Sequence, residues 1–468
     1  MIVFTLLLAS ITLASCDHTT TKTAESSIQA PTPIEFVNGI TDSNKGLRKG
    51  QVIIKGTLPM AMKGKFYLWE TSGKVTELID STSINEGNFA FRQQELESGI
   101  YMVGVNATNM AAVIISTAEP EVNLQFKAAK LESAMSSMIS IENQGWIKYM
   151  AQEPGILKAI KDAKVAGHKN PGMKGQYDLQ ATQKESELAA LQHKIIAEYP
   201  GTFLAKIMTW KQEPNKTDML KYFDNIDFTD ESLIHTKVMS DRIETYMRTF
   251  SKGEENGFIS CISTIADKTK VNDRVLEYSL NQMLVGFYES NMENICMYII
   301  DNYINGEACG DSDLSNVIKS TASSIKNLSI GQTPPNIQLT TSSGAKYDLY
   351  KTAAANKYTL IMFWSSWCEH CKGEAPEVKA CYDQWKSKGF DIVGVSIDKN
   401  KQAWTSALAE RGFAFPQVCG MNEYQSPVAK DYRVSKTPTF YLLDAQQKIV
   451  LKPKGIREVQ TFLAANLK

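Results

Sequence analysis

The sequence predicts a multidomain fold, with an N-terminal all-β, sandwich-like domain, a helical middle region and a C-terminal α/β domain. Apolar residues alternate with polar ones at strand spacing in residues 49–126, and they recur at helical spacing in residues 127–328. Strand and helix patterns then alternate in residues 329–468, which indicates a central sheet flanked by helices. The length of 468 residues fits about two to four domains.

The N-terminus predicts export and attachment to a membrane. The apolar run Ile2–Ala14 is too short to span a bilayer and has the length of a signal-peptide core, so residues 1–15 are interpreted as a signal peptide. Leu13-Ala14-Ser15-Cys16 resembles a lipobox, in which the Cys receives lipid and anchors the protein at a membrane. Because no Lys or Arg precedes the run, an ordinary cleaved signal with an incidental Cys16 is the alternative.

The expected location is therefore the periplasmic side of the cell envelope, where the chain is anchored by lipid and disulfides can persist. Residues 16–48 are rich in Thr, Ser, Ala and Pro, and this composition predicts a flexible tether. Residues 49–126 follow as the β domain. Phe89 and Phe91 alternate with small or polar neighbours there, and Ser72-Gly73-Lys74 is typical of a hairpin turn. We expect an antiparallel sandwich.

The helical region is predicted from apolar stripes at helical spacing. Leu188, Leu191 and Ile195 fall on one face, and Pro200-Gly201 ends that helix. A second long helical stretch is predicted from about Val271 to Tyr303. These stripes indicate helix–helix packing rather than a cofactor site.

In the C-terminal domain, a buried strand is predicted at Tyr358–Trp364 and a helix at Cys371–Trp385. The remaining elements predicted there are strands at Phe390–Ile397, Phe440–Leu443 and Ile449–Leu451, and helices at Gln402–Arg411 and Arg457–Leu467.

A CxxC motif joins the first of these strands to the helix. Cys368 is expected at the helix N-terminus, where unpaired N–H groups and the helix dipole stabilise a thiolate. Cys371 lies one turn further, close enough to form a disulfide with it. Between them, a cationic His370 favours the thiolate and Glu369 opposes it, so both residues are expected to tune the redox potential.

Two further residues are candidates for the site. Glu374 follows Cys371 by three positions on the same helical face, where a partly buried carboxyl group could exchange a proton with the second thiol. The alternative is a solvated helix residue. Thr437-Pro438 stands just before a predicted strand, so Pro438 is a candidate cis-proline, although a trans-proline at a strand edge is the alternative.

Residues 330–468 resemble the membrane-tethered thioredoxin-like reductases of the TlpA/ResA type. The resemblance is carried by Phe363-Trp364-Ser365-Ser366-Trp367-Cys368-Glu369-His370-Cys371-Lys372-Gly373-Glu374-Ala375-Pro376, by Val393-Gly394-Val395-Ser396-Ile397-Asp398 and by Thr437-Pro438-Thr439. It implies a thioredoxin-like fold with Cys368 as attacking thiol, Cys371 as resolving thiol and Glu374 as proton relay. It also implies a cis-proline at Pro438 and contacts to substrate from Trp367, Thr437 and Pro438. The whole layout resembles the multidomain thioredoxin-like lipoproteins of Bacteroidota.

The resemblance favours a reductase of extracytoplasmic protein disulfides that is re-reduced by a membrane electron donor. A disulfide oxidase or isomerase is one alternative, and an envelope binding module with secondary redox activity is another. A peroxidase is least favoured, because the CxxC pair is intact.

No cofactor, metal or nucleic acid is expected, because no metal-ligand spacing or nucleotide fingerprint is present and the 50 basic side chains are balanced by 51 acidic ones. Of the other cysteines, Cys381 is expected to be a buried inert thiol, and an auxiliary role for Cys419 is conceivable. Pairing among Cys261, Cys296 and Cys309 is left open.

Overall fold

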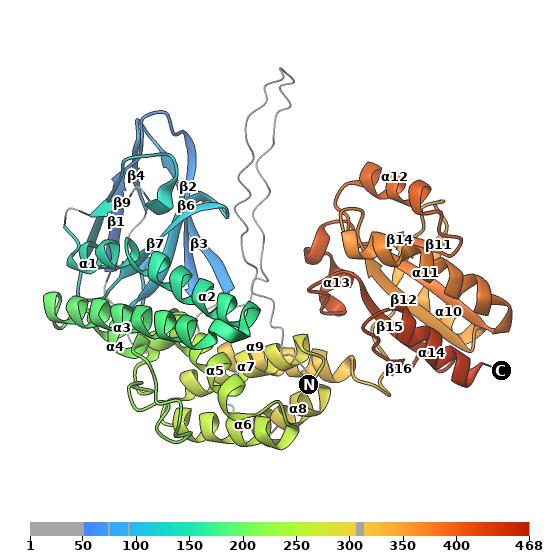
Figure 1. Ribbon diagram of the computed structural model, residues 1–468. Coiled ribbons are helices and arrows are strands. Elements are labelled where there is room, and N and C mark those ends of the chain that lie inside the picture. Colours follow the sequence, from blue (N-terminus) through green and yellow to red (C-terminus); the bar gives the residue numbers. More distant parts are fainter. Residues whose placement is uncertain are drawn as a thin grey trace. The chain divides into compact units, whose positions relative to one another are not determined.

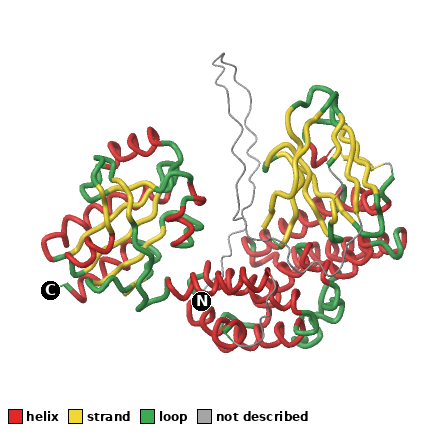
Figure 2. Tube along the Cα trace, turned by 180° about the vertical axis from the view of Figure 1, so that it is seen from behind, coloured by secondary structure: helices red, strands yellow, loops and turns green. Residues whose placement is uncertain are grey.

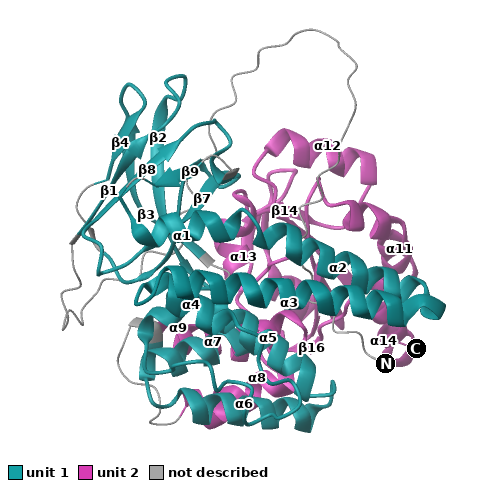
Figure 3. Ribbon diagram, turned by 60° about the vertical axis from the view of Figure 1, so that its left-hand side comes forward, with its two compact units in different colours: residues 1–4, 42–283, 309–315 teal, residues 5–41, 284–308, 316–468 magenta. Residues whose placement is uncertain are grey.

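A computed structural model describes residues 51–73, 75–91, 94–133, 135–137, 139–305 and 313–467. The predicted signal peptide and most of the tether, with Cys16, lie outside these residues, and so does Cys309. The described residues form two compact units (Figure 3): unit 1 holds those between 51 and 283 together with 313–315, and unit 2 holds 284–305 and 316–467. Over this part of the chain, no helix is long and apolar enough to cross a bilayer.

Unit 1 begins with the predicted β sandwich (Figure 1). Its strands are β1 (Gln51–Thr57), β2 (Gly64–Ser72), β3 (Val75–Ile84), β4 (Asn88–Ala90), β5 (Gln94–Glu95), β6 (Gly99–Asn106), β7 (Asn109–Ile115), β8 (Glu121–Phe126) and β9 (Met135–Ser137). One sheet has the order β4–β1–β8–β9, with β5 also paired to β1, and the other has the order β3–β2–β6–β7. Phe66, Phe89 and Phe126 are buried together in the core of this β layer. The all-β prediction is confirmed.

The expectation that all strands pair antiparallel is wrong at one position. β1 and β8 run parallel, with Ile54 opposite Val122. These strands lie at the two ends of the β region and are not joined by a hairpin, so no short turn forces them to run in opposite directions. Hairpin and turn signals in a sequence report only on neighbouring strands.

The helical region follows within unit 1. Its helices are α1 (Ile141–Met150), α2 (Glu153–Lys169), α3 (Lys174–Glu198), α4 (Phe203–Lys211), α5 (Val238–Phe250) and α6 (Glu255–Thr269), with short 3-10 turns at Leu131–Ser133, Pro171–Met173 and Glu231–His235. Figure 2 shows part of this helical region beside the strands of the sandwich. Asn143 of α1 hydrogen-bonds both backbone groups of Ile114, which fastens the helix to the edge strand β7.

The helical stretch predicted from Val271 to Tyr303 is divided into two helices. The segment forms α7 (Asp273–Glu289) and α8 (Glu293–Ile299), and α8 continues into a π-helical turn at Ile300–Ile304. Asn291 between the helices has a φ of 56°, a left-handed conformation that ends a helix and that Asn tolerates better than most residues. The division between the two units falls within α7.

Unit 2 contains the predicted α/β domain. Its elements are α9 (Asp313–Asn327, from 316 on), β10 (Gln338–Thr340), β11 (Lys346–Asp348), α10 (Leu349–Ala355), β12 (Tyr358–Trp364), α11 (Glu369–Trp385), β13 (Phe390–Ser396), α12 (Lys401–Arg411), β14 (Gln417–Cys419), α13 (Pro427–Asp431), β15 (Thr439–Asp444), β16 (Ile449–Leu451) and α14 (Ile456–Asn466). The main sheet has the order β14–β13–β12–β15–β16. β13 and β14 run parallel to β12, whereas β15 runs antiparallel to it.

Both faces of this sheet are buried, as expected for the uninterrupted apolar run of β12. Leu360 and Met362 point into a core shared with α11 and α14, whereas Ile361 and Phe363 point into a core shared with α10 and α13. The alternation of side chains along a strand produces these two cores. β12 is thus held on both sides, and its carboxyl end is a rigid support for the CxxC segment.

The segment 284–305 belongs to unit 2 as well. The Tyr288 hydroxyl lies 3.2 Å from the Tyr441 hydroxyl, and Glu293 pairs with Lys452 at 3.2 Å. Glu293 also accepts the Ile330 N–H at 2.9 Å. The domain boundaries proposed from the sequence at 126/127 and 328/329 stay predictions.

Candidate redox site

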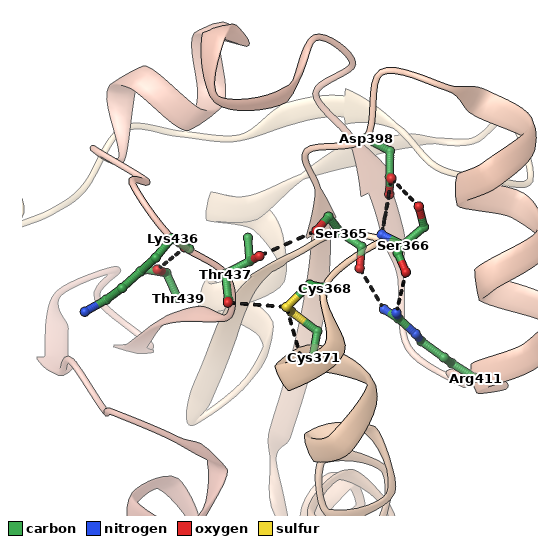
Figure 4. The surroundings of a disulfide bond; sticks show 9 residues. All are labelled: Ser365, Ser366, Cys368, Cys371, Asp398, Arg411, Lys436, Thr437 and Thr439. Carbon is green, nitrogen blue, oxygen red and sulfur yellow. Dashed lines mark hydrogen bonds between the residues drawn. A yellow bond between two sulfur atoms is a disulfide. The ribbon is translucent and has the colours of Figure 1, made fainter. Parts of the chain in front are cut away.

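The CxxC segment forms the junction between β12 and α11 (Figure 4). β12 ends at Trp364, and α11 begins at Glu369 with Cys368 as its N-cap residue. The Cys368 Sγ accepts the N–H of Cys371 at 3.0 Å, so this sulfur occupies the place of a capping oxygen. An anionic sulfur at this point is stabilised by the amide and by the helix dipole.

Cys368 and Cys371 are joined by a disulfide, and their Cα atoms lie 5.3 Å apart. The two sulfurs differ in accessibility. Cys371 is fully buried, whereas Cys368 keeps 6% of its surface exposed. An external thiol or disulfide can therefore approach Cys368 but not Cys371 without a local rearrangement.

The loop before β15 lies against the Cys368 sulfur. The Thr437–Pro438 peptide bond is cis. The Thr437 carbonyl oxygen lies 3.3 Å from Cys368 Sγ, and the Thr437 hydroxyl lies 3.5 Å from that of Ser365 (Figure 4). A sulfur in a disulfide carries no proton, so this is a contact in the oxidised form and becomes a possible S–H donation only after reduction.

Glu374 lies one turn beyond Cys371, and its carboxyl group is partly buried. Burial raises the pKa of this carboxyl, although a hydrogen bond from the Ile456 N–H at the start of α14 opposes the shift. One carboxyl oxygen is buried without a hydrogen-bond partner among the described residues. Such a group favours its protonated form more than a solvated Glu does.

The loop between β12 and the CxxC pair is fixed by Asp398, which follows β13 and is 2% exposed. Its carboxylate accepts the Ser366 N–H at 3.0 Å and the Ser366 hydroxyl at 2.5 Å. It also accepts the Ser396 hydroxyl at 2.7 Å. This set of hydrogen bonds holds the carboxyl ends of the parallel strands β12 and β13 together.

Arg411, in the last turn of α12, fixes the same loop from a second direction (Figure 4). It donates to the Ser365 carbonyl at 3.1 Å and to the Ser366 carbonyl at 3.0 Å. Its guanidinium also lies 4.5 Å above the Trp364 ring, in cation–π contact. Burial lowers the pKa of Arg411, and nearby carboxylates including Asp398 oppose that shift.

The sequence prediction did not give a role to either Asp398 or Arg411. A signal for Asp398 was available, because it follows a predicted strand and the carboxyl ends of parallel strands meet at one edge of a sheet. No local signal identified Arg411, since its two acceptors are backbone carbonyls far away in the sequence.

The remaining predicted site residues lie at the surface of the CxxC helix. Trp367 is 51% exposed, and its ring lies edge-to-face 6.1 Å from that of Tyr424. Glu369 and His370 are exposed. Trp367 and Glu369 flank Cys368 in the sequence, and His370 follows; all three are exposed.

The other described cysteines are free thiols away from this pair. Burial raises the pKa of Cys261 to about 11 and the pKa values of Cys296 and Cys381 to about 12. These three are protonated and inert at neutral pH. Cys419 is partly exposed, and its Sγ lies 3.3 Å from the Asp398 carbonyl oxygen.

Comparison with known proteins identifies relatives of the C-terminal part. Residues 330–452 match the AhpC/TSA family. Over 125 residues the chain is 31% identical to the thiol–disulfide oxidoreductase ResA of Bacillus subtilis, and this match covers 27% of the chain and 67% of ResA. The relationship therefore concerns the domain that carries the CxxC segment.

Solved structures match the same part. The thioredoxin domain of a thiol–disulfide oxidoreductase from Bacteroides vulgatus is 26% identical, and the match covers 30% of this chain and 99% of that domain with a TM-score of 0.28. A thiol:disulfide interchange protein from Bacteroides sp. is 27% identical, with 30% of this chain and 91% of that protein covered and a TM-score of 0.28.

Proposed function

The chain belongs to the TlpA/ResA-type family of thioredoxin-like thiol–disulfide oxidoreductases, and from this premise we propose that it reduces protein disulfides outside the cytoplasm through Cys368 and Cys371. The observation that carries the proposal is the position of Cys368. Its sulfur caps α11, is the more exposed of the pair and lies against the Thr437 carbonyl. A thiolate there is stabilised and can be reached by a substrate.

The proposed reaction is a two-step exchange. The Cys368 thiolate attacks one sulfur of the substrate disulfide, which forms a mixed disulfide and releases the other substrate sulfur as a thiolate. The Cys371 thiolate then attacks Cys368 Sγ, which releases the second substrate sulfur and leaves the Cys368–Cys371 disulfide. The substrate gains two electrons and two protons, and a membrane electron donor restores the dithiol.

Four further roles are proposed for residues around the pair. Thr437, next to Pro438, offers backbone groups to an extended substrate segment, as β-strand addition does in other complexes. The exposed ring of Trp367 supplies apolar contact area. Glu374, whose pKa is raised by burial, takes the proton of Cys371 when that thiol attacks. Glu369 and His370 tune the stability of the Cys368 thiolate.

We also propose that Cys16 is lipidated and that residues 16–48 tether the folded units at the periplasmic side of a membrane. The support is the lipobox-like Leu13-Ala14-Ser15-Cys16 after an apolar run of signal-peptide length. A membrane anchor places the enzyme near a membrane electron donor and in a compartment that contains protein disulfides.

The direction of electron flow is tested by the reduction potential of the Cys368–Cys371 couple in the full chain, equilibrated with glutathione or dithiothreitol buffers. We expect about −250 mV or lower, as for reductases of this fold. A value near −120 mV would instead identify a disulfide oxidant. In parallel, Cys371→Ser is expected to accumulate mixed disulfides with client proteins, and Cys368→Ser is expected to accumulate none.

The anchor is tested by fractionating cells that express the wild type or Cys16→Ser. We expect the wild type in the membrane fraction with incorporated fatty acid, and the variant without label and outside that fraction. Equal membrane association of the two proteins, with no fatty acid on either, rejects lipidation.

A further inference from the structure

Unit 1 contains a cavity of about 620 Å³, far along the chain from the CxxC segment. It lies between the face of the β3–β2–β6–β7 sheet that points away from the sandwich core and the helices α1, α4 and α5. Its volume is in the range of roughly 300–1,000 Å³ that small-molecule sites occupy. The proposed redox function makes no use of this cavity.

The floor of the cavity is apolar because β6 and β7 carry apolar residues on both faces. Tyr101 and Val103 of β6 point into the sandwich core and are almost fully buried. Successive side chains of a strand alternate, so their neighbours point the other way, toward the cavity. The floor consists of Ile100, Met102, Met110, Ala112 and Trp146. The four strand residues remain partly exposed, and an apolar occupant would bury them.

The wall of the cavity carries an excess of positive charge, with five cationic and three carboxylate side chains. Two of the cations are already neutralised, since Lys211 pairs with Glu153 at 2.5 Å and Lys216 pairs with Glu213. The third carboxylate is Asp241. The other three cations, Lys237, Arg242 and Arg248, form no ion pair with any residue that the structure describes.

Arg242 is the most telling of these cations, because it is only 6% exposed. One guanidinium nitrogen donates to the Trp210 carbonyl at 2.7 Å and to the Gln212 carbonyl at the end of α4. The Nη1 atom has no acceptor among the described residues. Burial lowers the pKa of Arg242, although the Glu213 carboxylate and Tyr222, whose ring centroid lies 5.5 Å from the guanidinium, oppose the shift.

A purely structural role accounts for only part of this arrangement. Fastening the end of α4 explains the bonds of Nη2 but not the unpaired charge that remains on Arg242. It also does not explain Lys237, which precedes α5, and Arg248 of α5, which are both exposed and line the same cavity. A charge of the opposite sign inside the cavity would compensate the buried charge of Arg242, and Lys237 and Arg248 add to the positive potential around it.

We propose that this cavity binds a small amphiphilic anion. Its apolar body packs on the floor formed by Met102, Met110 and their neighbours, and its carboxylate or phosphate group lies near Lys237, Arg242 and Arg248. Flexible Met side chains adapt to apolar groups of different shape. The ligand is therefore defined by its anionic group and by the length of its apolar part, and not by a particular ring. This site is a binding activity separate from thiol–disulfide exchange.

The test is calorimetric titration of the full chain with three probes of one chain length, decanoate, decyl phosphate and decanol, each below its micelle concentration. We expect at least one of the anions to bind with one-to-one stoichiometry, and decanol to bind about tenfold more weakly or not at all. The two anions distinguish a carboxylate from a phosphate ligand. Failure of both anions, or equal binding of decanol, overturns the proposal.

Three variants locate the binding. The double variant Lys237→Glu/Arg248→Glu reverses two exposed charges at the cavity. The control is the double variant Lys127→Glu/Lys161→Glu, which changes the net charge equally at exposed positions outside the cavity. We expect the first pair to weaken anion binding about tenfold or more and the second to leave it unchanged. Ala112→Phe, which fills the floor, should abolish binding of every probe. Equal effects of the two charge pairs, or full binding by Ala112→Phe, also overturn the proposal.

Discussion

Glu374 is partly buried beside the N-terminus of α14, and burial raises the pKa of its carboxyl group. The role proposed for it, to take the Cys371 proton, requires the ionised carboxylate. The rate of disulfide reduction should therefore fall as the pH falls through its raised pKa. In Glu374→Gln we expect a rate lower by about a hundredfold near neutral pH and the loss of this acid limb. Stopped-flow kinetics with a model disulfide, between pH 5 and 9, measure both effects.

Glu377 is the matched control for this substitution. It lies three residues further along α11, and its ion pair with Arg457 at 2.8 Å lowers its pKa. Glu377→Gln removes the same charge at a partly exposed position. Because the Glu377 carboxylate helps to raise the pKa of Glu374, the acid limb should remain in this variant but move to lower pH. If the two variants share one profile, the proton relay is not at Glu374.

At the scale of elements, the loop between β12 and α11 depends on side chains from elsewhere in the fold. Arg411 supplies hydrogen bonds to two backbone carbonyls of this loop, those of Ser365 and Ser366. Arg411→Met keeps the length of the side chain but leaves both carbonyls without this donor. We expect unit 2 to lose about 1–3 kcal/mol of unfolding free energy. We also expect the reduced Cys368 to react at a changed rate with iodoacetamide, because its loop is no longer fixed.

Lys401→Met removes a cation from the first turn of the same helix, where the side chain is exposed. An exposed substitution of this kind changes stability by only about 0.5 kcal/mol or less. Denaturant unfolding of both variants measures the comparison. Arg411 has no special role in the loop if the two variants are equally stable and equally reactive.

The elements show which parts of the fold a sequence can predict. The strand Tyr358–Trp364 and the helix after it were predictable because their apolar periodicity and the CxxC spacing are local. The parallel pairing of β1 with β8 was not predictable in this way, because those strands meet only in the folded chain.

The same limit applies to the candidate site. Cys368 and Cys371 are candidates because of their local CxxC spacing, whereas the role expected for Glu374 depends on the family resemblance. The bonds of Ser366 to Asp398 and Arg411 join residues 32 and 45 positions apart, so no periodicity reports on them. The break between α7 and α8 depends on one residue, Asn291, whose left-handed conformation is only weakly signalled by its type.

At the scale of the whole molecule, the two compact units have separate buried cores, so we expect two unfolding transitions. Leu124→Ala removes a fully buried side chain from the unit 1 sandwich, and this should lower one transition by about 2–5 kcal/mol. Scanning calorimetry of this variant assigns the transition of unit 1. The pH dependence of that transition can then be followed by itself.

Unit 1 holds a charged cluster that makes its stability sensitive to alkaline pH. The Nε2 atom of the buried His235 lies 2.7 Å from a carboxylate oxygen of Glu97. Its Nδ1 atom lies 2.6 Å from a carboxylate oxygen of Glu70, which is an ion-pair distance, but the angles do not fit a hydrogen bond. Burial lowers the pKa of His235, but the two carboxylates outweigh burial and raise the pKa to about 9. Arg274 supports the cluster through Glu97 at 3.0 Å.

Because the folded pKa of His235 lies above the unfolded value near 6.5, its stabilising effect is complete below pH 6.5 and is lost as the pH rises through about 9. We expect the unfolding free energy of unit 1 to fall by about 2 kcal/mol between pH 6.5 and 8.5. His235→Gln should be less stable at pH 6.5 and nearly independent of pH over this window. His168→Gln, at an exposed position of the same unit, should keep the wild-type dependence. A unit 1 transition that does not move with pH in the wild type shows that His235 is neutral in the folded protein.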